Sequence, residues 1–478
     1  MELHRATRLL FASSALAAVA SLPPTLLRAQ AFGLNEIGSC AVSRAFAATA
    51  SPCKDASTIF WNPAAATNLP GWSVTGGIAA IAVNGSFTAD TSHRKWDADL
   101  PTEWVPHLFV NYHKPTSSWA WGIGAYVPYG LTSQWTDDFP GRFSAKKASL
   151  KTIYVQPNVA YQITPNWSIG GGPIWGHSSV ELIQGVDLAP IVTPAPGNPT
   201  FGQLGIAAGT EFARVRLKGS GDAFGAQIGI YGHPSPSWMV GARFLTPMTF
   251  KYNDADATFT QVSTGLVIGG TLAPPFSAGT PVDSLVACQF RTCGSAVGAL
   301  TPQTADTKIT HPAQFQGGVA YSGWRNWLIE GDYAWVGWKR FDVLPVTFNG
   351  PASANSRTLI EGYNNSSAIR LGAQYTTGYS GLQLRAGFAG VASAAPAETV
   401  TPLLPEQDRT YWTLGFGWPI TSMWAVDGAY AHISTGGARG RIVERTTTSN
   451  TNATAAQLNS GVFDLSANIF SLTLKAFF

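Results

Sequence analysis

The sequence predicts an all-β membrane protein, a 14-stranded antiparallel outer-membrane β-barrel whose lumen is plugged by the N-terminal segment. Two patterns predict this fold: apolar and polar residues alternate with period two, and connections alternate between short and long. The composition agrees, since charged residues make up 12% of the 478 residues, about half the usual share, and aromatic residues another 12%. The mean hydropathy of +0.05 is too low for a bundle of membrane helices. A net charge of +3 gives no indication of nucleic-acid binding.

Residues 1–31 are predicted to form a signal peptide. Three basic residues precede an apolar core over residues 9–20, and two A-x-A sites follow. We favour cleavage after Ala31, which makes Phe32 the first residue of the mature chain. A membrane anchor is the alternative, but the core is too short and ends at a Pro-Pro pair. After Ala31, no run of about 18 apolar residues predicts a transmembrane helix.

The four cysteines are compatible with two disulfides in an oxidising compartment. The pairs Cys40–Cys53 and Cys288–Cys293 close the shortest loops, although the sequence leaves the connectivity open. Because no histidines neighbour them, the spacings do not favour a metal site, and we expect no metal or cofactor.

Residues 32–70 are too irregular for strands and are rich in aromatic residues. A barrel of fourteen strands encloses more space than its own side chains fill. We therefore expect this segment to plug the lumen, with Asn62, Pro63 and Ala64 as a corner, because proline cannot continue the preceding turn. The alternative is a periplasmic tail, which would be more charged and less aromatic.

Residues 71–478 are expected to form the barrel. The final segment shows the pattern most clearly, since Phe470, Leu472 and Leu474 share one face and Ser471 and Thr473 the other. The expected strands cover residues 72–83, 107–114, 119–130, 150–163, 167–182, 221–232, 237–252, 313–322, 326–346, 366–377, 381–392, 409–420, 423–435 and 462–478.

The connections between these strands are alternately tight and long, the longest over residues 183–220 and 253–312. Short periplasmic turns and long outer loops are typical of outer-membrane barrels, and an even strand number places both chain ends in the periplasm. A soluble β-sandwich would also alternate, but it explains neither this rhythm nor the low charge. The terminal Phe478 resembles the C-terminal signature of bacterial outer-membrane proteins, so we expect the barrel assembly machinery as a partner.

Five stretches, in order along the mature chain, carry a recognisable pattern: 32-FGLNEIGSCAVSRAFAA-48, 55-DASTIFWNPAAATNL-69 with its Asn-Pro-Ala motif, 127-VPYGLTSQW-135, 332-DYAWVGWKRFD-342 and 404-LPEQDRTYWTLGFGW-418. Together they resemble the long-chain fatty acid transporter (FadL) family. The resemblance implies a 14-stranded barrel closed by an N-terminal hatch, passive uptake of hydrophobic molecules across the outer membrane, and a monomer. Ser and Cys in 38-GSCAVSRAFAA-48 replace a stretch that is usually Gly-rich in the family.

Uptake of an apolar molecule requires an apolar capture site and an exit that avoids water. Long alkyl chains suit such a site because burial gains about 0.8 kcal/mol per CH2 group. We expect fatty acids to be the ligand, with neutral aromatic or aliphatic hydrocarbons as the alternative. The aromatic capture candidates are Trp135, Phe139, Phe143, Trp335, Trp338 and Phe341. Several of them could instead belong to the interface girdle.

The gating candidates lie in the predicted plug and in the third strand. A proline within a strand removes a ladder hydrogen bond, and the family resemblance implies a kink in this strand that opens a lateral window. The candidates are Phe32, Asn62, Pro63, Ala64, Gly122, Gly124 and Pro128, of which the two glycines would supply local flexibility.

Arg385 and Arg142 are the candidates for binding a carboxylate head group. Alternation places Arg385, Arg243 and Arg370 in the lumen, where they could instead form an ion-pair lattice with acidic residues. If the ligand is a neutral hydrocarbon, no arginine needs to contact it.

Two other classes of protein fit less well. No G-x-S-x-G or H-E-x-x-H motif indicates an enzyme, so we expect no catalytic residues. A general porin would have charged rings and an open lumen. The expected partners are a hydrophobic ligand, outer-membrane lipid and lipopolysaccharide.

Overall fold

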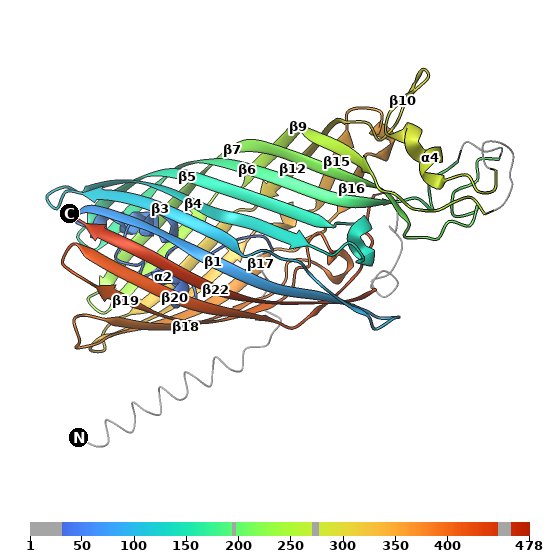
Figure 1. Ribbon diagram of the computed structural model, residues 1–478. Helices are drawn as coiled ribbons and strands as arrows, with labels where there is room; N and C mark the ends of the chain where they lie inside the picture. Colours follow the sequence, from blue (N-terminus) through green and yellow to red (C-terminus); the bar gives the residue numbers. More distant parts are fainter. Residues whose placement is uncertain (1–30, 194–196, 270–276, 448–459) are drawn as a thin grey trace.

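The computed structural model describes residues 31–193, 197–269, 277–447 and 460–478. Fourteen antiparallel strands close into a barrel in which the last strand pairs with the first (Figure 1). The wall strands are β1 (Gly71–Ala89), β3 (Glu103–His113), β4 (Trp119–Gln134), β5 (Lys147–Thr164), β6 (Trp167–Asp187), β7 (Glu211–Ser235), β8 (Trp238–Leu245) continued by β9 (Met248–Gln261), β12 (Gln303–His311) continued by β13 (Gln314–Tyr321), β14 (Trp327–Val336) continued by β15 (Val343–Phe348), β16 (Arg357–Ile360) continued by β17 (Ser366–Thr376), β18 (Gln383–Val391), β19 (Arg409–Pro419), β20 (Trp424–Thr435) and β22 (Gly461–Phe477).

Shorter elements belong to the connections and to the N-terminal segment. They are β2 (Lys95–Asp97), β10 (Thr292–Cys293), β11 (Ala296–Val297), β21 (Ala438–Gly440), α2 (Ser39–Ser43), α3 (Thr58–Trp61), α4 (Val282–Val286), η2 (Pro63–Asn68), η3 (Pro140–Phe143), η4 (Ala287–Gln289), η5 (Trp338–Arg340), η6 (Ser353–Asn355) and η7 (Ala397–Thr399). No helix in the described ranges is long and apolar enough to cross a membrane.

The predicted alternation is confirmed in the last strand. Phe470, Leu472 and Leu474 are about half exposed on the outer face of β22, whereas Ser471 and Thr473 are buried inside. An aromatic band surrounds the end that carries the short turns, where Trp72 packs on Tyr112 with ring centroids 4.7 Å apart. The long loops gather at the opposite end (Figure 1).

The paired strands β9 and β12 are longer than the sequence pattern predicts. We expected a loop over residues 253–312, but β9 continues to Gln261 and β12 begins at Gln303. In the extension of β9, Ala255 and Ala257 are buried on the inner face, whereas Asp256 and Thr258 are exposed on the outer face. The outward side chains are polar because this part of the strand projects beyond the apolar band, so the strand lacks the apolar outer face by which the sequence pattern was recognised.

Residues 32–70, termed the plug segment below, lie inside the ring of strands (Figure 1). Most are buried, and their backbone amides bind inward-facing side chains of the wall. The Ser39 amide donates to Thr473 of β22 at 3.0 Å, and the Thr49 amide donates to Asp332 of β14 at 2.9 Å. The wall side chains therefore supply the partners that an irregular backbone lacks.

Both expected disulfides are confirmed. Cys40–Cys53 joins two parts of the plug segment, and Cys288–Cys293 lies in the long connection that follows β9. The signal-peptide prediction falls almost entirely on residues 1–30, outside the described residues.

Candidate functional site

The ladder of β4 is interrupted close to its middle. Its register with β5 shifts between Tyr126 and Tyr129, so Val127 and Pro128 have no β5 partner. Pairing with β3 ends at His107 and Tyr126. A gap in the hydrogen-bond ladder therefore separates residues 103–106 of β3 from the outer half of β4 within the described chain.

The start of the plug segment binds this irregular part of β4. The Leu34 amide donates to the Pro128 carbonyl at 2.8 Å, and the Gly130 amide donates to the Phe32 carbonyl at 3.0 Å. Pro128 was a gating candidate because its ring removes a ladder bond. The structure places the irregularity at Val127 and Pro128, where the plug segment takes the place of a neighbouring strand.

Gly122 and Gly124 lie in the regularly paired part of β4. Both have ladder partners on β3 and on β5. A Cβ on Gly122 would lie 2.7 Å from Ile59 of the plug segment, and one on Gly124 would lie 2.4 Å from the Phe109 ring. Both glycines leave room for neighbouring side chains, and the flexibility expected of them from the sequence stays a prediction.

A cavity of about 430 Å³ occupies the gap and connects two environments. On the lumenal side its lining includes Leu34, Tyr411 and Ile433, and on the outer side it includes Trp104 and Ile153, which are about half exposed on the lipid face. Its walls are mainly apolar, and its size is within the range of small-molecule sites. It therefore reaches from the barrel interior to the outside of the wall.

Glu103 bridges the gap with polar contacts. The Thr132 hydroxyl of β4 donates to the Glu103 carboxylate at 2.7 Å, and the Lys151 ammonium of β5 lies 3.5 Å from it. All three line the cavity. The sequence analysis did not select them, because only the curvature of the wall brings them together.

The lumenal end of the cavity is polar. Arg409 lies 2.7 Å from Glu406. Glu36 also lines this end. Burial raises the pKa of the Glu406 carboxyl, and Arg409 opposes that rise. The sequence analysis did not select Arg409, because it used residues 404–409 only as part of a stretch that resembles the family.

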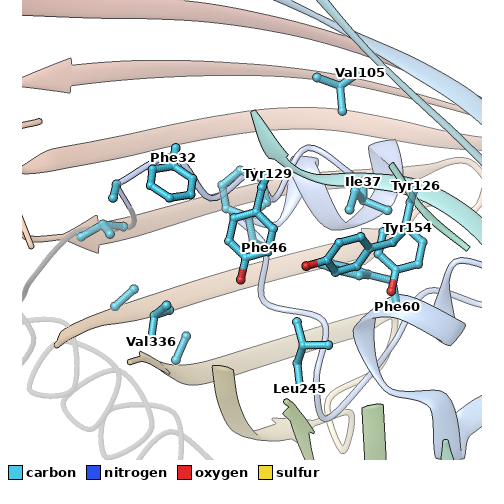
Figure 2. Packing of buried hydrophobic residues seen from close by; sticks show 14 of the residues in the cluster. Phe32, Ile37, Phe46, Phe60, Val105, Tyr126, Tyr129, Tyr154, Leu245 and Val336 are labelled. Carbon is cyan, nitrogen blue, oxygen red and sulfur yellow. The ribbon is translucent and has the colours of Figure 1, made fainter. Parts of the chain in front are cut away.

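Three of the aromatic candidates pack together around the start of the plug segment. The Phe32 ring centroid lies 4.5 Å from Trp338, 5.5 Å from Phe341 and 6.1 Å from Tyr129. Trp338 and Phe341 are buried. Figure 2 shows Phe32 and Tyr129 within the larger cluster of buried residues that joins the plug segment to the wall.

The other aromatic candidates are dispersed. Trp135 and Phe139 stack with centroids 4.3 Å apart in a separate buried cluster, and Trp135 also lines the cavity. Phe143 lies at the loop end of the barrel, where the centre of the Arg142 guanidinium is 4.3 Å from the centroid of its ring. Trp335 lies on the lipid-facing side of β14 beside Tyr333, as the girdle alternative expects.

The two arginines considered for a head group already have acidic partners. Arg385 lies 3.0 Å from Asp427, which also pairs with Lys475, and Arg142 lies 3.1 Å from Glu211. Arg243 and Arg370 instead pack on rings of the plug segment and donate to amide or carbonyl oxygens. The ion-pair lattice alternative thus fits Arg385, whereas no ion pair within 4.0 Å includes Arg243 or Arg370 among the described residues.

The Asn62-Pro63-Ala64 corner fits closely against the wall. The Asn62 side-chain amide donates to the carbonyls of Thr49 at 2.9 Å and Ile230 at 3.0 Å, and its oxygen accepts from the Ala64 amide at 3.3 Å. Pro63 begins η2, where its missing N–H costs nothing. The corner thus ties two stretches of the plug segment to β7.

Comparison with known proteins agrees with this architecture. The family model described as "Outer membrane protein transport protein (OMPP1/FadL/TodX)" matches residues 19–478. The chain belongs to this family. Its members are described as transport proteins rather than enzymes, and the protein is an outer-membrane β-barrel.

Individual relatives are distant but are matched over most of their length. The long-chain fatty acid transport protein of an Escherichia coli strain is 24% identical, over 88% of this chain and 91% of its own. Outer membrane protein P1 of Haemophilus influenzae is 25% identical, over 96% and 99%. Among solved structures, a Pseudomonas aeruginosa FadL homologue has a TM-score of 0.75 at 18% identity, covering 94% of this chain and all of its own. The Pseudomonas putida toluene transporter TodX has a TM-score of 0.62 at 13% identity, over 94% and 99%.

Proposed function

We propose that this protein takes up hydrophobic molecules passively across the outer membrane and releases them sideways through the gap between β3 and β4. The observation that carries the proposal is the cavity, whose lining runs from Leu34 inside the barrel to Trp104 and Ile153 outside. A ligand that leaves along this route moves from one apolar environment to another without crossing water.

The contacts of the plug segment support a lateral route over an axial one. Its amides bind Glu330 and Asp332 of β14, its corner binds β7, and a disulfide closes residues 40–53. Displacing it would break many buried hydrogen bonds at once, whereas the gap beside β4 needs only small movements. In this proposal the segment acts as a plug, and Phe32, held by Trp338 and Phe341, controls access to the cavity.

Long-chain fatty acids are the proposed ligands. Several curated relatives are described as long-chain fatty acid transport proteins, and the polar end of the cavity offers Arg409 to a carboxylate. Arg409 is better placed for this role than Arg142 or Arg385, since neither of those lines the cavity.

Neutral hydrocarbons are the second candidate, for a specific reason. Glu406 already balances the charge of Arg409, and Glu36 lies nearby, so this end of the cavity carries no excess positive charge. Such an environment would accept an uncharged aromatic or aliphatic molecule without the cost of burying a carboxylate.

Filling the cavity tests the route. Val127→Trp places a large side chain in the gap, where the backbone has no β5 partner. We expect uptake of a fluorescent long-chain fatty acid by cells that lack other transporters for it to fall at least ten-fold. Val319→Trp, on the exposed lipid face of β13, is the matched control and should leave uptake unchanged. Normal uptake by a folded Val127→Trp variant would refute the lateral route.

Comparing a fatty acid with its methyl ester distinguishes the two ligand classes. If Arg409 binds the carboxylate, Arg409→Gln weakens binding of the acid and not of the ester. Equal binding of acid and ester by both proteins favours the hydrocarbon alternative.

A further inference from the structure

Two lysines face each other on the outer surface of the barrel. Lys251 of β9 and Lys308 of β12 are directly opposite in the antiparallel ladder, and both are exposed. Their neighbours Phe250 and Tyr252 are fully buried, which places the lysines on the outward face. Like charges directly opposite on neighbouring strands repel each other and destabilise the pair.

Neither lysine has an acidic partner in the part of the chain that the structure describes, where no ion pair within 4.0 Å includes them. Two nearby carboxylates have other partners. Asp222 of β7 follows Gly221, which lies beside the Lys251 backbone, and its carboxylate is 2.8 Å from His177. The Asp306 carboxylate accepts from the Asp254 amide at 2.8 Å and from the Asn349 side chain at 3.1 Å. The two lysines therefore lack an ion-pair partner among the described residues.

The height of the pair in the membrane follows from its strands. Trp238 and Tyr321 are partners at the turn end, with ring centroids 4.8 Å apart. The lysines lie thirteen residues further along the same two wall strands, a rise of about 30 Å for strands tilted by about 40°. The apolar band of such barrels is about 25 Å tall, so the pair lies just above it.

The outward-facing side chains of the two wall strands change from apolar to polar to charged toward the loop end. Phe244 and Phe315 are partners on the lipid face, and above them Thr249 and Thr310 share a hydrogen bond of 3.0 Å between their hydroxyls. The lysines form the next outward level. This is the level at which the outer leaflet of an outer membrane carries the phosphates of its glycolipid.

We propose that Lys251 and Lys308 bind a phosphate group of lipopolysaccharide from the outer leaflet. A phosphate between the two ammonium groups removes their repulsion and forms charge-assisted hydrogen bonds with both. The acyl chains of the same lipid then lie along the apolar surface that Phe244 and Phe315 present. The site is independent of the ligand cavity and does not rest on the transport route.

Native mass spectrometry of the detergent-solubilised protein tests the site with a defined probe, hexa-acylated lipid A carrying two phosphates. Each basic side chain near an anionic lipid surface contributes about a five-fold change in binding, so Lys251→Gln/Lys308→Gln should bind about 25-fold more weakly. The control Lys114→Gln/Arg325→Gln removes the same charge from exposed positions at the opposite end and should bind like the unaltered protein.

Dephosphorylated lipid A separates phosphate recognition from binding of the acyl chains. We expect the unaltered protein to bind it as weakly as the double lysine variant binds the phosphorylated form. Equal binding of both lipids, or an unchanged affinity in a double variant that remains folded by its heat-dependent gel mobility, would overturn the proposal. Either result would leave the transport proposal untouched.

Discussion

Asn62→Asp is the sharpest test of how the plug segment is held. Aspartate has almost the same shape and retains the oxygen that accepts from the Ala64 amide. It loses the two N–H donors that bind the carbonyls of Thr49 and Ile230, and it places a carboxylate oxygen against one of them. The substitution therefore removes the link between the corner and β7 without changing volume.

The magnitude follows from burial. Asn62 is fully buried, and leaving two buried carbonyls without donors costs about 2 to 4 kcal/mol. The population in which the corner detaches should rise by about 30-fold to several hundred-fold, since every 1.4 kcal/mol is a factor of ten. Detachment opens a path for ions through the lumen.

Single-channel recording in planar bilayers measures this population as intermittent current. We expect an almost silent unaltered protein and frequent openings in Asn62→Asp, with the barrel still folded. Asn355→Asp makes the same chemical change at an exposed site and should remain silent.

The contact between Asn62 and Thr49 can also be disturbed by a substitution in the barrel wall. A Cβ on Gly241 would lie 2.1 Å from the Thr49 carbonyl oxygen and 2.7 Å from the Asn62 amide nitrogen. Gly241→Ala should therefore also produce openings, whereas Gly317→Ala, with no atom closer than 3.6 Å, should not. If Asn62→Asp and Gly241→Ala both remain silent in folded barrels, the corner does not seal the lumen and the reasoning fails.

Three further perturbations test other contacts. Cys40→Ser/Cys53→Ser removes about 3 kcal/mol of stabilisation for a loop of this length, so openings should become more frequent in bilayer recordings and no longer respond to reductant. Trp338→Ala removes the ring whose centroid lies 4.5 Å from that of Phe32, and hydrogen exchange at the Leu34 amide, which donates to Pro128 of β4, should accelerate at least ten-fold. At the loop end of the barrel, burial raises the pKa of Glu361 and that of Glu444, and repulsion by Glu444 raises the pKa of Glu361 further. The folded loops at this end bind the neutral forms of both carboxyls, so the contribution of these groups to stability is complete below about pH 4.5 and is lost as the pH rises through the folded-state pKa values. Proteolysis of these loops should therefore be faster at pH 9 than at pH 6. The difference between the two pH values should be smaller in Glu361→Gln.

The wall could be predicted from the sequence because the membrane imposes a local rule. Along β22, lipid contact selects Phe470, Leu472 and Leu474 on one face, so period-two alternation is visible without knowing any partner strand. The rule ends where the membrane ends. The outer parts of β9 and β12 carry polar side chains on the outward face, while Ala255, Ala257 and Ala305 are buried on the inner face. Without an apolar outer face, the pattern that lipid contact imposes is missing there.

The candidate site was predictable only in part. Pro128 pointed to the irregular part of β4 because the effect of proline on a ladder is local. The contact of Glu103 with Thr132 and that of Phe32 with Trp338 depend on residues far apart in the chain. Neither pair leaves a periodic signal, and the tertiary fold alone brings them together.

The wall glycines show why contacts with the plug segment were harder to predict from the sequence than the strands of the wall. A Cβ on Gly170 would lie 2.6 Å from the Pro63 carbonyl oxygen, and one on Gly387 would lie 2.4 Å from the Arg44 carbonyl carbon. A side chain at these points would push the plug segment away from the wall. Glycine is therefore required at these positions by contact with the plug segment on the inner face of the wall. The alternation of apolar and polar residues reflects only the contact of the outer face with lipid, so it could not reveal this requirement. It follows that substitutions to alanine on the inner face should affect sealing according to their distance from the plug segment, independently of their effect on the stability of the barrel.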